Sequence, residues 1–307
     1  MTVTMSLTEG LSVLNFQASR IVQRFDKDSA QTIWGFLLIY GRMSSIAAVT
    51  PTICRLMGVK PPRLSKAEAL DSVLCEAEAE GIVGRVSRVL IYAPDALGEG
   101  IYRDYEPLYD HVKGLAPVEV EMRSVLPTYT PVCFASMFTG AEPEAHGIMR
   151  YEKPVLRCDT LFDALSRAGR RVALVAVRDC SIDLIFRGRD IDYYTEPYDP
   201  EVVRRTLMLL CEGAHDLMVA YNQEYDDVMH RSTPRSPEAI EAFKRHLDAF
   251  SVLGEAFNVA YAAENRCIAF CPDHGTHIDP TTGKGAHGTD ASNDVDVRHF
   301  WGIYRGG

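Results

Sequence analysis

Residues 127–148 read PTYTPVCFASMFTGAEPEAHGI, and this stretch decides how the rest of the chain is interpreted. Thr130 stands directly before Pro131, a residue that favours the first turn of a helix, and Gly140 is suited to end that helix. The start of a helix attracts anions because its first backbone N–H groups are free and the helix dipole is positive there. Thr130 is therefore a candidate nucleophile toward an anionic substrate. An ordinary helix begun by a proline would give the same local pattern, so the rest of the chain must decide.

The composition is that of a large globular protein with an excess of acidic residues. The 307 residues are 47% hydrophobic and 24% charged, enough to bury the core of one large α/β domain. The net charge of −10 argues against a nucleic-acid-binding surface, because such a surface needs a basic face. An anionic substrate would then need local cations, most simply metal ions.

The sequence carries no sign of a targeting or membrane segment. Residues 1–14 lack a basic stretch followed by an apolar one, and no apolar run approaches the roughly 20 residues that cross a bilayer. We therefore expect a cytoplasmic protein without a membrane partner. The sequence leaves the oligomeric state open.

The pattern of apolar residues changes near residue 86. Residues 1–85 have helical periodicity, whereas residues 86–307 alternate between buried strands and helices, which is typical of a mostly parallel sheet. The predicted strands are 88–93, 118–122, 171–177, 216–221, 266–271 and 300–304, and the main predicted helices are 160–168, 202–211 and 237–263. We expect an α/β fold whose helical N-terminal region packs on a catalytic domain at 86–307.

Acidic and imidazole side chains follow several of these strands. Asp95 comes after the first strand, and Asp226 and His230 come after the strand 216–221. Asp273 and His274 follow the strand 266–271, and His287 lies in a later loop. The carboxyl ends of parallel strands form the edge at which ligands bind in such sheets. Each residue alone is weak evidence for a ligand-binding site. Their number and their order along the chain together are stronger evidence.

Together with residues 127–148, these side chains resemble the alkaline phosphatase superfamily, in particular its type I phosphodiesterase/nucleotide pyrophosphatase branch, which has a threonine nucleophile. The resemblance implies a three-layer, alkaline-phosphatase-like sandwich around a mostly parallel sheet. It also implies two metal sites, one held by Asp226, His230 and His287, the other by Asp95, Asp273, His274 and the Thr130 oxygen. Mixed imidazole and carboxylate ligands suit Zn²⁺ best, with Mn²⁺ or Fe as alternatives.

The implied activity is hydrolysis of a small phosphorylated substrate, a phosphodiester or phosphomonoester, through a phosphothreonine at Thr130. One departure leaves the substrate open. Where the branch has an Asn that binds a phosphate oxygen, this chain has Tyr151, flanked by Arg150 and Lys153. We take these three residues as candidates for substrate binding. A phosphonate hydrolase or a phosphomutase would use the same site, and a catalytically silent member that binds an anion or a partner protein is a further alternative.

Residues 45–62, SIAAVTPTICRLMGVKPP, predict a helix that starts near Pro51 and ends at Gly58. The segment is similar to a helix that members of this superfamily usually carry after their last metal-binding histidine. Here it precedes the first such residue. We therefore expect a circularly permuted element that packs beside the strand 300–304, and a chance helix with ordinary caps is the alternative.

Overall fold

An eight-stranded sheet runs through residues 43–307, the part of the chain that the computed structural model describes. The helical pattern predicted for residues 1–42 lies outside the described residues. The strand order is β1-β3-β10-β7-β2-β6-β4-β5. β10 is antiparallel to both of its neighbours, and the remaining pairs of described strands are parallel. The predicted α/β class with a mostly parallel sheet is confirmed.

The elements have the following bounds. The strands of the sheet are β1 (Ser44–Ser45), β2 (Arg88–Pro94), β3 (Val118–Arg123), β4 (Val172–Val177), β5 (Asp192–Glu196), β6 (Leu217–Asn222), β7 (Arg266–Phe270) and β10 (Asp296–Tyr304), and a separate ribbon consists of β8 (His277–Ile278) and β9 (Gly285–Ala286). The helices are η1 (Ile46–Ala48), α3 (Val49–Met57), α4 (Asp71–Ala79), α5 (Glu99–Asp104), η2 (Glu106–Tyr109), α6 (Asp110–Leu115), α7 (Thr130–Thr139), α8 (Pro143–His146), α9 (Leu161–Arg167), α10 (Ser181–Ile185), α11 (Asp199–Glu212), α12 (Glu224–Arg231), α13 (Pro237–Ala260) and α14 (Ser292–Val295).

The central strands form because their sequences are almost continuously apolar. β4 reads VALVAV and β6 reads LMVAYN, and all residues of both strands are buried. Strands that are covered on both faces have this composition, because the side chains on both faces pack against other elements and not against water. Each residue predicted as a strand between 88 and 93 likewise lies in β2.

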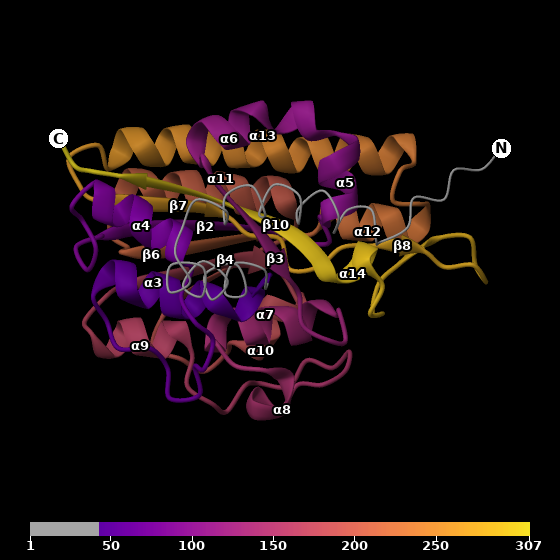
Figure 1. Cartoon of the computed structure of the whole chain (residues 1–307), viewed down its shortest axis with the longest axis horizontal. Helices are drawn as coiled ribbons and strands as arrows, with labels where there is room; N and C mark the ends of the chain where they lie inside the picture. Colours follow the sequence, from indigo (N-terminus) through magenta and orange to yellow (C-terminus); the bar gives the residue numbers. More distant parts are fainter. Residues whose placement is uncertain (1–42) are drawn as a thin grey trace, which may run out of the picture. The chain divides into compact units, whose positions relative to one another are not determined.

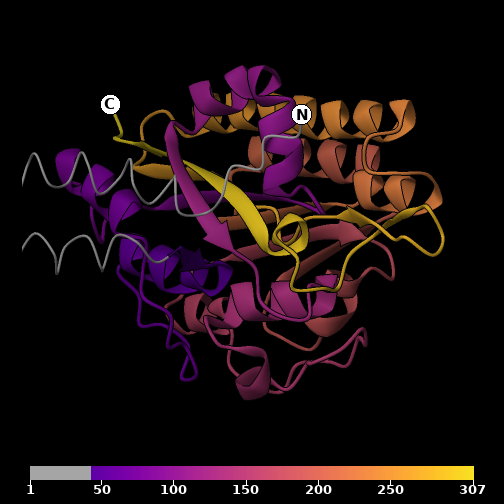
Figure 2. The same cartoon turned by 45° about the vertical axis from the view of Figure 1, so that its right-hand side comes forward.

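Helices cover both faces of this sheet (Figure 1). On one face α11 packs on β4 and β6, α13 packs on β2, and α6 packs against α13. On the other face lie α7, α9 and α10, with α3 against α7 and α9. The turned view shows the same two layers of helices with the sheet between them (Figure 2). Among residues 43–307, no helix combines the length and the apolar character needed to cross a membrane.

The first described elements are built into this unit. β1 extends the sheet by pairing with β3, and the Thr50 hydroxyl donates to the Met137 carbonyl of α7 at 2.7 Å. We expected the helix that contains Pro51 to lie beside residues 300–304. Instead, α4 packs against β10 and β3, and the main neighbours of α3 are α4, α7, α9 and η1. The segment thus supports the helix that begins at Thr130.

The sheet places the ligand-bearing loops together. β7, β2 and β6 are consecutive in the sheet and parallel to one another, so they all end at the same edge. Asp95 follows β2, Asp273 follows β7, and α12 follows β6. Residues far apart in the chain therefore meet in one place, as the parallel topology requires.

Candidate active site

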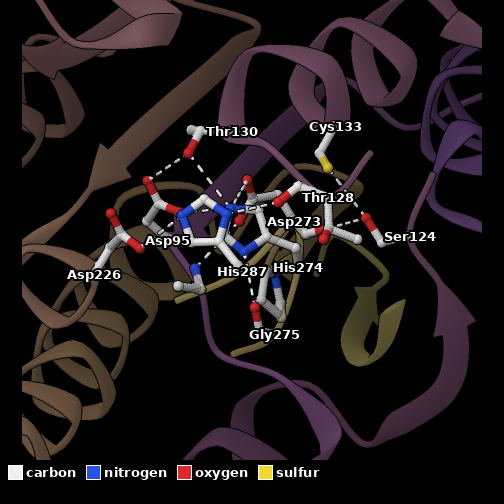
Figure 3. A network of polar contacts seen from close by, with 12 residues as sticks. Asp95, Ser124, Thr128, Thr130, Cys133, Asp226, Asp273, His274, Gly275 and His287 are labelled. Atoms are coloured by element: carbon white, nitrogen blue, oxygen red, sulfur yellow. Dashed lines mark hydrogen bonds and ion pairs between the residues drawn. The ribbon is translucent and has the colours of Figure 1, made fainter. Parts of the chain in front are cut away.

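The seven side chains predicted as catalytic or metal-binding meet at this edge of the sheet. All of them except His230 are labelled in Figure 3. They come from five segments: the ends of β2 and β7, helix α12, the loop after β9, and the start of α7. They form two groups, one of Asp226, His230 and His287, the other of Asp95, Asp273 and His274 with Thr130 beside it.

The first cluster is built on α12. Asp226 and His230 are four residues apart, which puts both side chains on one face of the helix. Asp226 Oδ1 lies 3.4 Å from His230 Nε2 and 3.5 Å from His287 Nε2. The two Nε2 atoms are 3.1 Å apart. Three donor atoms thus face a common point.

The second cluster is fully buried. His274 Nε2 lies 3.3 Å from Asp273 Oδ2 and 3.4 Å from Asp95 Oδ1. The Thr130 hydroxyl oxygen is 3.4 Å from both His274 Nε2 and Asp95 Oδ2. The two clusters adjoin, because the rings of His274 and His287 stack with their centroids 4.1 Å apart.

Backbone carbonyls fix the protonation of all three imidazoles. His230 Nδ1 is 3.0 Å from the Gly285 carbonyl, and His274 Nδ1 is 3.1 Å from the Gly275 carbonyl. His287 Nδ1 is 2.7 Å from the carbonyl of Thr128. A carbonyl can only accept, so each Nδ1 carries the proton and each Nε2 turns a lone pair toward its cluster. This is the arrangement of a histidine that binds a metal through Nε2.

The carboxylates leave one oxygen each for a ligand. Within residues 43–307, Asp95 Oδ1, Asp226 Oδ1 and Asp273 Oδ2 are buried without a hydrogen-bond partner. The second oxygen of Asp95 accepts from the Tyr221 hydroxyl, and that of Asp273 accepts from the Ala96 amide at 3.2 Å. A buried carboxylate oxygen without a partner is costly, and a divalent cation would remove that cost. The donor set therefore fits two divalent ions.

The electrostatics of the clusters also favour cations. Burial, and for Asp95 also the neighbouring charge of Asp273, raises the pKa of the Asp95 and Asp273 carboxyls well above the usual range. Burial lowers the pKa of His274 and His287, so both imidazoles are neutral near pH 7. Asp95 and Asp273 thus need a positive partner that His274 and His287 do not supply, whereas in the other cluster the neighbouring Asp226 carboxylate raises the pKa of His230.

Thr130 is the first residue of α7 and is almost fully buried, at 5% exposure. Pro131 follows it in the first turn, and the helix ends at Gly140 with a left-handed φ of 69°. The hydroxyl thus lies at the positive end of a ten-residue helix and beside the second cluster. Both the local sequence and the sheet topology are needed to place it there.

A cavity of about 470 Å³ opens beside the two clusters. Tyr151 and Lys153 line it, together with Tyr129, and the Lys153 ammonium donates to the Asp179 carbonyl at 3.0 Å. Arg150 is not among the lining residues. Its side chain is 79% exposed and pairs with Glu152 at 2.9 Å. The structure thus brings two of the three candidate substrate residues to the cavity.

Sequence reasoning missed three residues at this site: Arg178, Asp179 and Tyr221. Arg178 follows β4 and lines the cavity, and within the described part of the chain its guanidinium has no hydrogen bond or ion pair. Asp179, the next residue, lines the cavity as well. Tyr221, near the end of β6, orients Asp95. The signal available in the sequence was position, since all three residues lie at or directly after the carboxyl end of an apolar strand.

The loop that carries His287 is held by a buried carboxylate. Asp294 accepts from the Thr289 amide and hydroxyl at 2.9 and 2.7 Å and lies 2.8 Å from His277 Nδ1. These contacts fix the loop next to His287.

Residues 115–164 match the model of the type I phosphodiesterase/nucleotide pyrophosphatase family. None of the curated proteins matches. Phosphonoacetate hydrolase from Sinorhizobium meliloti 1021, solved with phosphonoformate, is 19% identical with a TM-score of 0.47, over 62% of this chain and 57% of that chain. Murine ectonucleotide pyrophosphatase/phosphodiesterase 5, an inactive variant solved with AMP, is 18% identical with a TM-score of 0.45, over 62% and 57%.

The chain thus spans less than two thirds of either protein of known structure. The family match covers the end of α6, strand β3, helix α7 with Thr130, helix α8, and most of α9. Over residues 115–164, the resemblance to the type I phosphodiesterase/nucleotide pyrophosphatase family that the sequence predicts is confirmed.

Proposed function

We propose that this protein hydrolyses phosphoric esters with two divalent metal ions and Thr130 as the nucleophile. The observation that carries the proposal is the pair of adjoining clusters, each with at least one unpaired buried carboxylate oxygen, beside a threonine hydroxyl 3.4 Å from Asp95 and His274. A structural cluster of acids and histidines would instead pair these oxygens with donors.

One ion would be held by Asp226, His230 and His287, and the other by Asp95, Asp273 and His274 with the Thr130 oxygen. Zn²⁺ suits these donors best, and Mn²⁺ or Fe are the alternatives. When bound, the ions supply electrostatic stabilisation for the charge that develops on the phosphoryl group and the leaving oxygen.

The residues of the chain then perform a double displacement. The Thr130 hydroxyl gives up its proton to solvent, and its oxygen forms a bond to phosphorus while the bond from phosphorus to the leaving oxygen breaks, which gives a phosphothreonine. The leaving oxygen takes up a proton from solvent. Water then attacks phosphorus, and the bond to Thr130 breaks, which restores the hydroxyl. Asp95 Oδ2 orients the hydroxyl for attack, and the start of α7 stabilises negative charge beside it.

The substrate is a small phosphorylated molecule whose leaving group occupies the cavity lined by Tyr151, Lys153 and Arg178. Two cations on this wall favour substrates with more negative charge than a simple diester, so we propose a monoester or a phosphonate as a substrate class in addition to the diester.

We also propose a cytoplasmic location. The eight cysteines, all within the described residues, are free, which agrees with a reducing compartment.

Metal analysis combined with an activity assay tests the proposal. The purified protein should bind about two zinc ions per chain and hydrolyse aryl phosphate monoesters or diesters. Asp226→Asn and Asp95→Asn should each remove one ion, because the two ligand sets are disjoint. Asp227→Asn is the control, since the Asp227 carboxylate accepts from Tyr198 and Gln223 and stands outside both clusters.

The outcomes separate the alternatives. A protein that binds no metal after supplementation contradicts the proposal outright. A protein that binds two ions but turns over none of the esters, phosphonates or phosphosugars offered to it would be the catalytically silent member.

A further inference from the structure

The N-terminus of α12 is held by side chains from two other helices. α12 carries Asp226 in its first turn and His230 in its last, and no side chain of its own caps it. The first N–H groups of a helix have no partner within the helix, so they need an acceptor from elsewhere. Here the amides of Gln223, Glu224 and Tyr225 all find one outside α12.

Asp199, the first residue of α11, provides two of these acceptors. Its Oδ1 accepts from the Gln223 amide at 3.0 Å, and its Oδ2 accepts from the Glu224 amide at 2.9 Å. The carboxyl is buried, at 5% exposure. Both of its oxygens are therefore used to fix the backbone at the start of a helix 24 residues further along the chain.

His246, in the middle of α13, provides the third acceptor. Its Nε2 accepts from the Tyr225 amide at 3.1 Å, and its Nδ1 lies 2.9 Å from the Tyr92 hydroxyl. Burial lowers the pKa of His246 to about 3, so the ring is neutral and Nε2 can accept. The Tyr92 contact then fixes the tautomer and the orientation of the ring.

We propose that Asp199 and His246 are positioning residues for the metal cluster of Asp226, His230 and His287. The proposal rests on the proposed function, because it assumes that this cluster binds an ion. Asp226 is only two residues from Glu224, so any shift of the helix start moves its carboxylate. Metal ligands must be held within about 0.5 Å of the productive geometry, and a rigid helix start provides this.

The first readout needs no metal. In the metal-free protein, Asp199→Ala should speed amide hydrogen exchange in peptides that cover residues 222–231, because two N–H groups lose their acceptor. Asp199→Asn keeps one acceptor oxygen and should have a smaller effect. If Asp199→Ala does not fold, Asp199→Asn and His246→Gln carry the same test.

The second readout is zinc affinity, measured by competition with a chelator. Burial raises the pKa of Asp199 to about 7, so the measurement is made near pH 8. Asp199→Ala should weaken one of the two zinc sites by roughly 10- to 100-fold, as loss of a supporting partner does elsewhere, and leave the other site unchanged. Zinc affinity at this site should be lowest in Asp199→Ala, intermediate in Asp199→Asn and highest in the parent.

Asp163 offers a matched control. Its carboxylate accepts from the Thr160 amide at 2.8 Å and so caps α9, a helix that carries no residue of either cluster. Asp163→Ala should lower stability by a similar amount and leave both zinc affinities unchanged.

The results distinguish the two proposals. If the parent binds no zinc, the proposed function fails. If the parent binds two ions and a folded Asp199 variant keeps both affinities and the exchange rates of residues 222–231, the positioning proposal is wrong. An equal loss of zinc affinity in the Asp163 control would also overturn it.

Discussion

Thr130 combines three conditions that few threonines meet together. It begins a helix, it is buried, and its oxygen is 3.4 Å from a carboxylate and an imidazole of the same cluster. A neutral threonine hydroxyl is a poor nucleophile, so its surroundings must provide the activation.

Substitution of Thr130 tests its proposed role as the nucleophile directly. Thr130→Ala should lower the turnover of an aryl phosphate by several orders of magnitude, because a covalent catalyst is lost, while most of the metal stays bound. Thr130→Ser should restore part of the rate, since it restores the hydroxyl. Turnover of the Ala variant close to that of the parent would show that Thr130 merely starts a helix.

Substitutions at Arg178 and Arg150 test which arginine binds the substrate, the one indicated by the structure or the one predicted from the sequence. Loss of a charged hydrogen bond costs about 1.5 to 3 kcal/mol, so Arg178→Gln should raise KM for an anionic substrate by roughly 10- to 100-fold. Arg150→Gln should change KM little, because Arg150 lies outside the cavity and pairs with Glu152. Steady-state kinetics of both variants decide, and the reverse ranking would favour the sequence-based choice.

The central strands could be predicted from the sequence, and the edge strands could not. β2, β4, β6 and β7 are apolar runs because both of their faces are covered. β5 reads DYYTE and lies at the edge of the sheet, half-buried along its length, so its sequence resembles a loop. β10 begins at Asp296, whereas the sequence predicts a strand only from residue 300. The first residues of β10 alternate between half-buried polar and buried positions, so they lack the continuous apolar run that marks the other strands.

The same reasoning explains which site residues were found. Asp95, Asp226, Asp273 and His274 follow apolar strands directly or after a few residues, so the chain pattern points to them. Asp199 and His246 act on α12 from other helices. Contacts of this kind depend on how helices pack, and a single sequence carries no local sign of them.

At the scale of elements, residues 44–85 are predicted to be part of the catalytic unit. Ile53 of α3 is fully buried, so Ile53→Ala should lower the free energy of unfolding by about 2 to 5 kcal/mol in a single cooperative transition. Deletion of residues 1–85 should give insoluble or molten protein. A truncated protein that unfolds cooperatively and keeps both metals would contradict this, and calorimetry with metal analysis can detect it.

At the scale of the whole molecule, buried neutral histidines make stability depend on pH. Burial lowers the pKa of His299 in β10 to about 4, whereas an unfolded histidine titrates near pH 6.5. Between these values the unfolded chain binds a proton that the folded chain does not. The stabilisation is therefore complete above pH 6.5 and is lost as the pH falls toward 4, by about 1.4 kcal/mol per pH unit.

Urea unfolding at pH 6.0 and 5.0 measures this effect. His299→Gln should show a pH dependence that is smaller than that of the parent by about 1.4 kcal/mol over this unit. His111→Gln serves as the matched substitution at an exposed histidine. An unchanged slope in the His299 variant would mean that the ring is protonated in the folded protein.

The place of β10 has a consequence for how the chain folds during synthesis. Within the described sheet β3 joins the other strands through β10, yet β10 is the last of these strands to leave the ribosome. Until then β3 and β7 each keep an open edge, and open edges invite pairing with other chains. More than half of the chain's residues are therefore synthesised between Thr130 and the strand that closes the sheet beside it, and throughout that interval we expect the open edges of β3 and β7 to need protection from other unpaired strands.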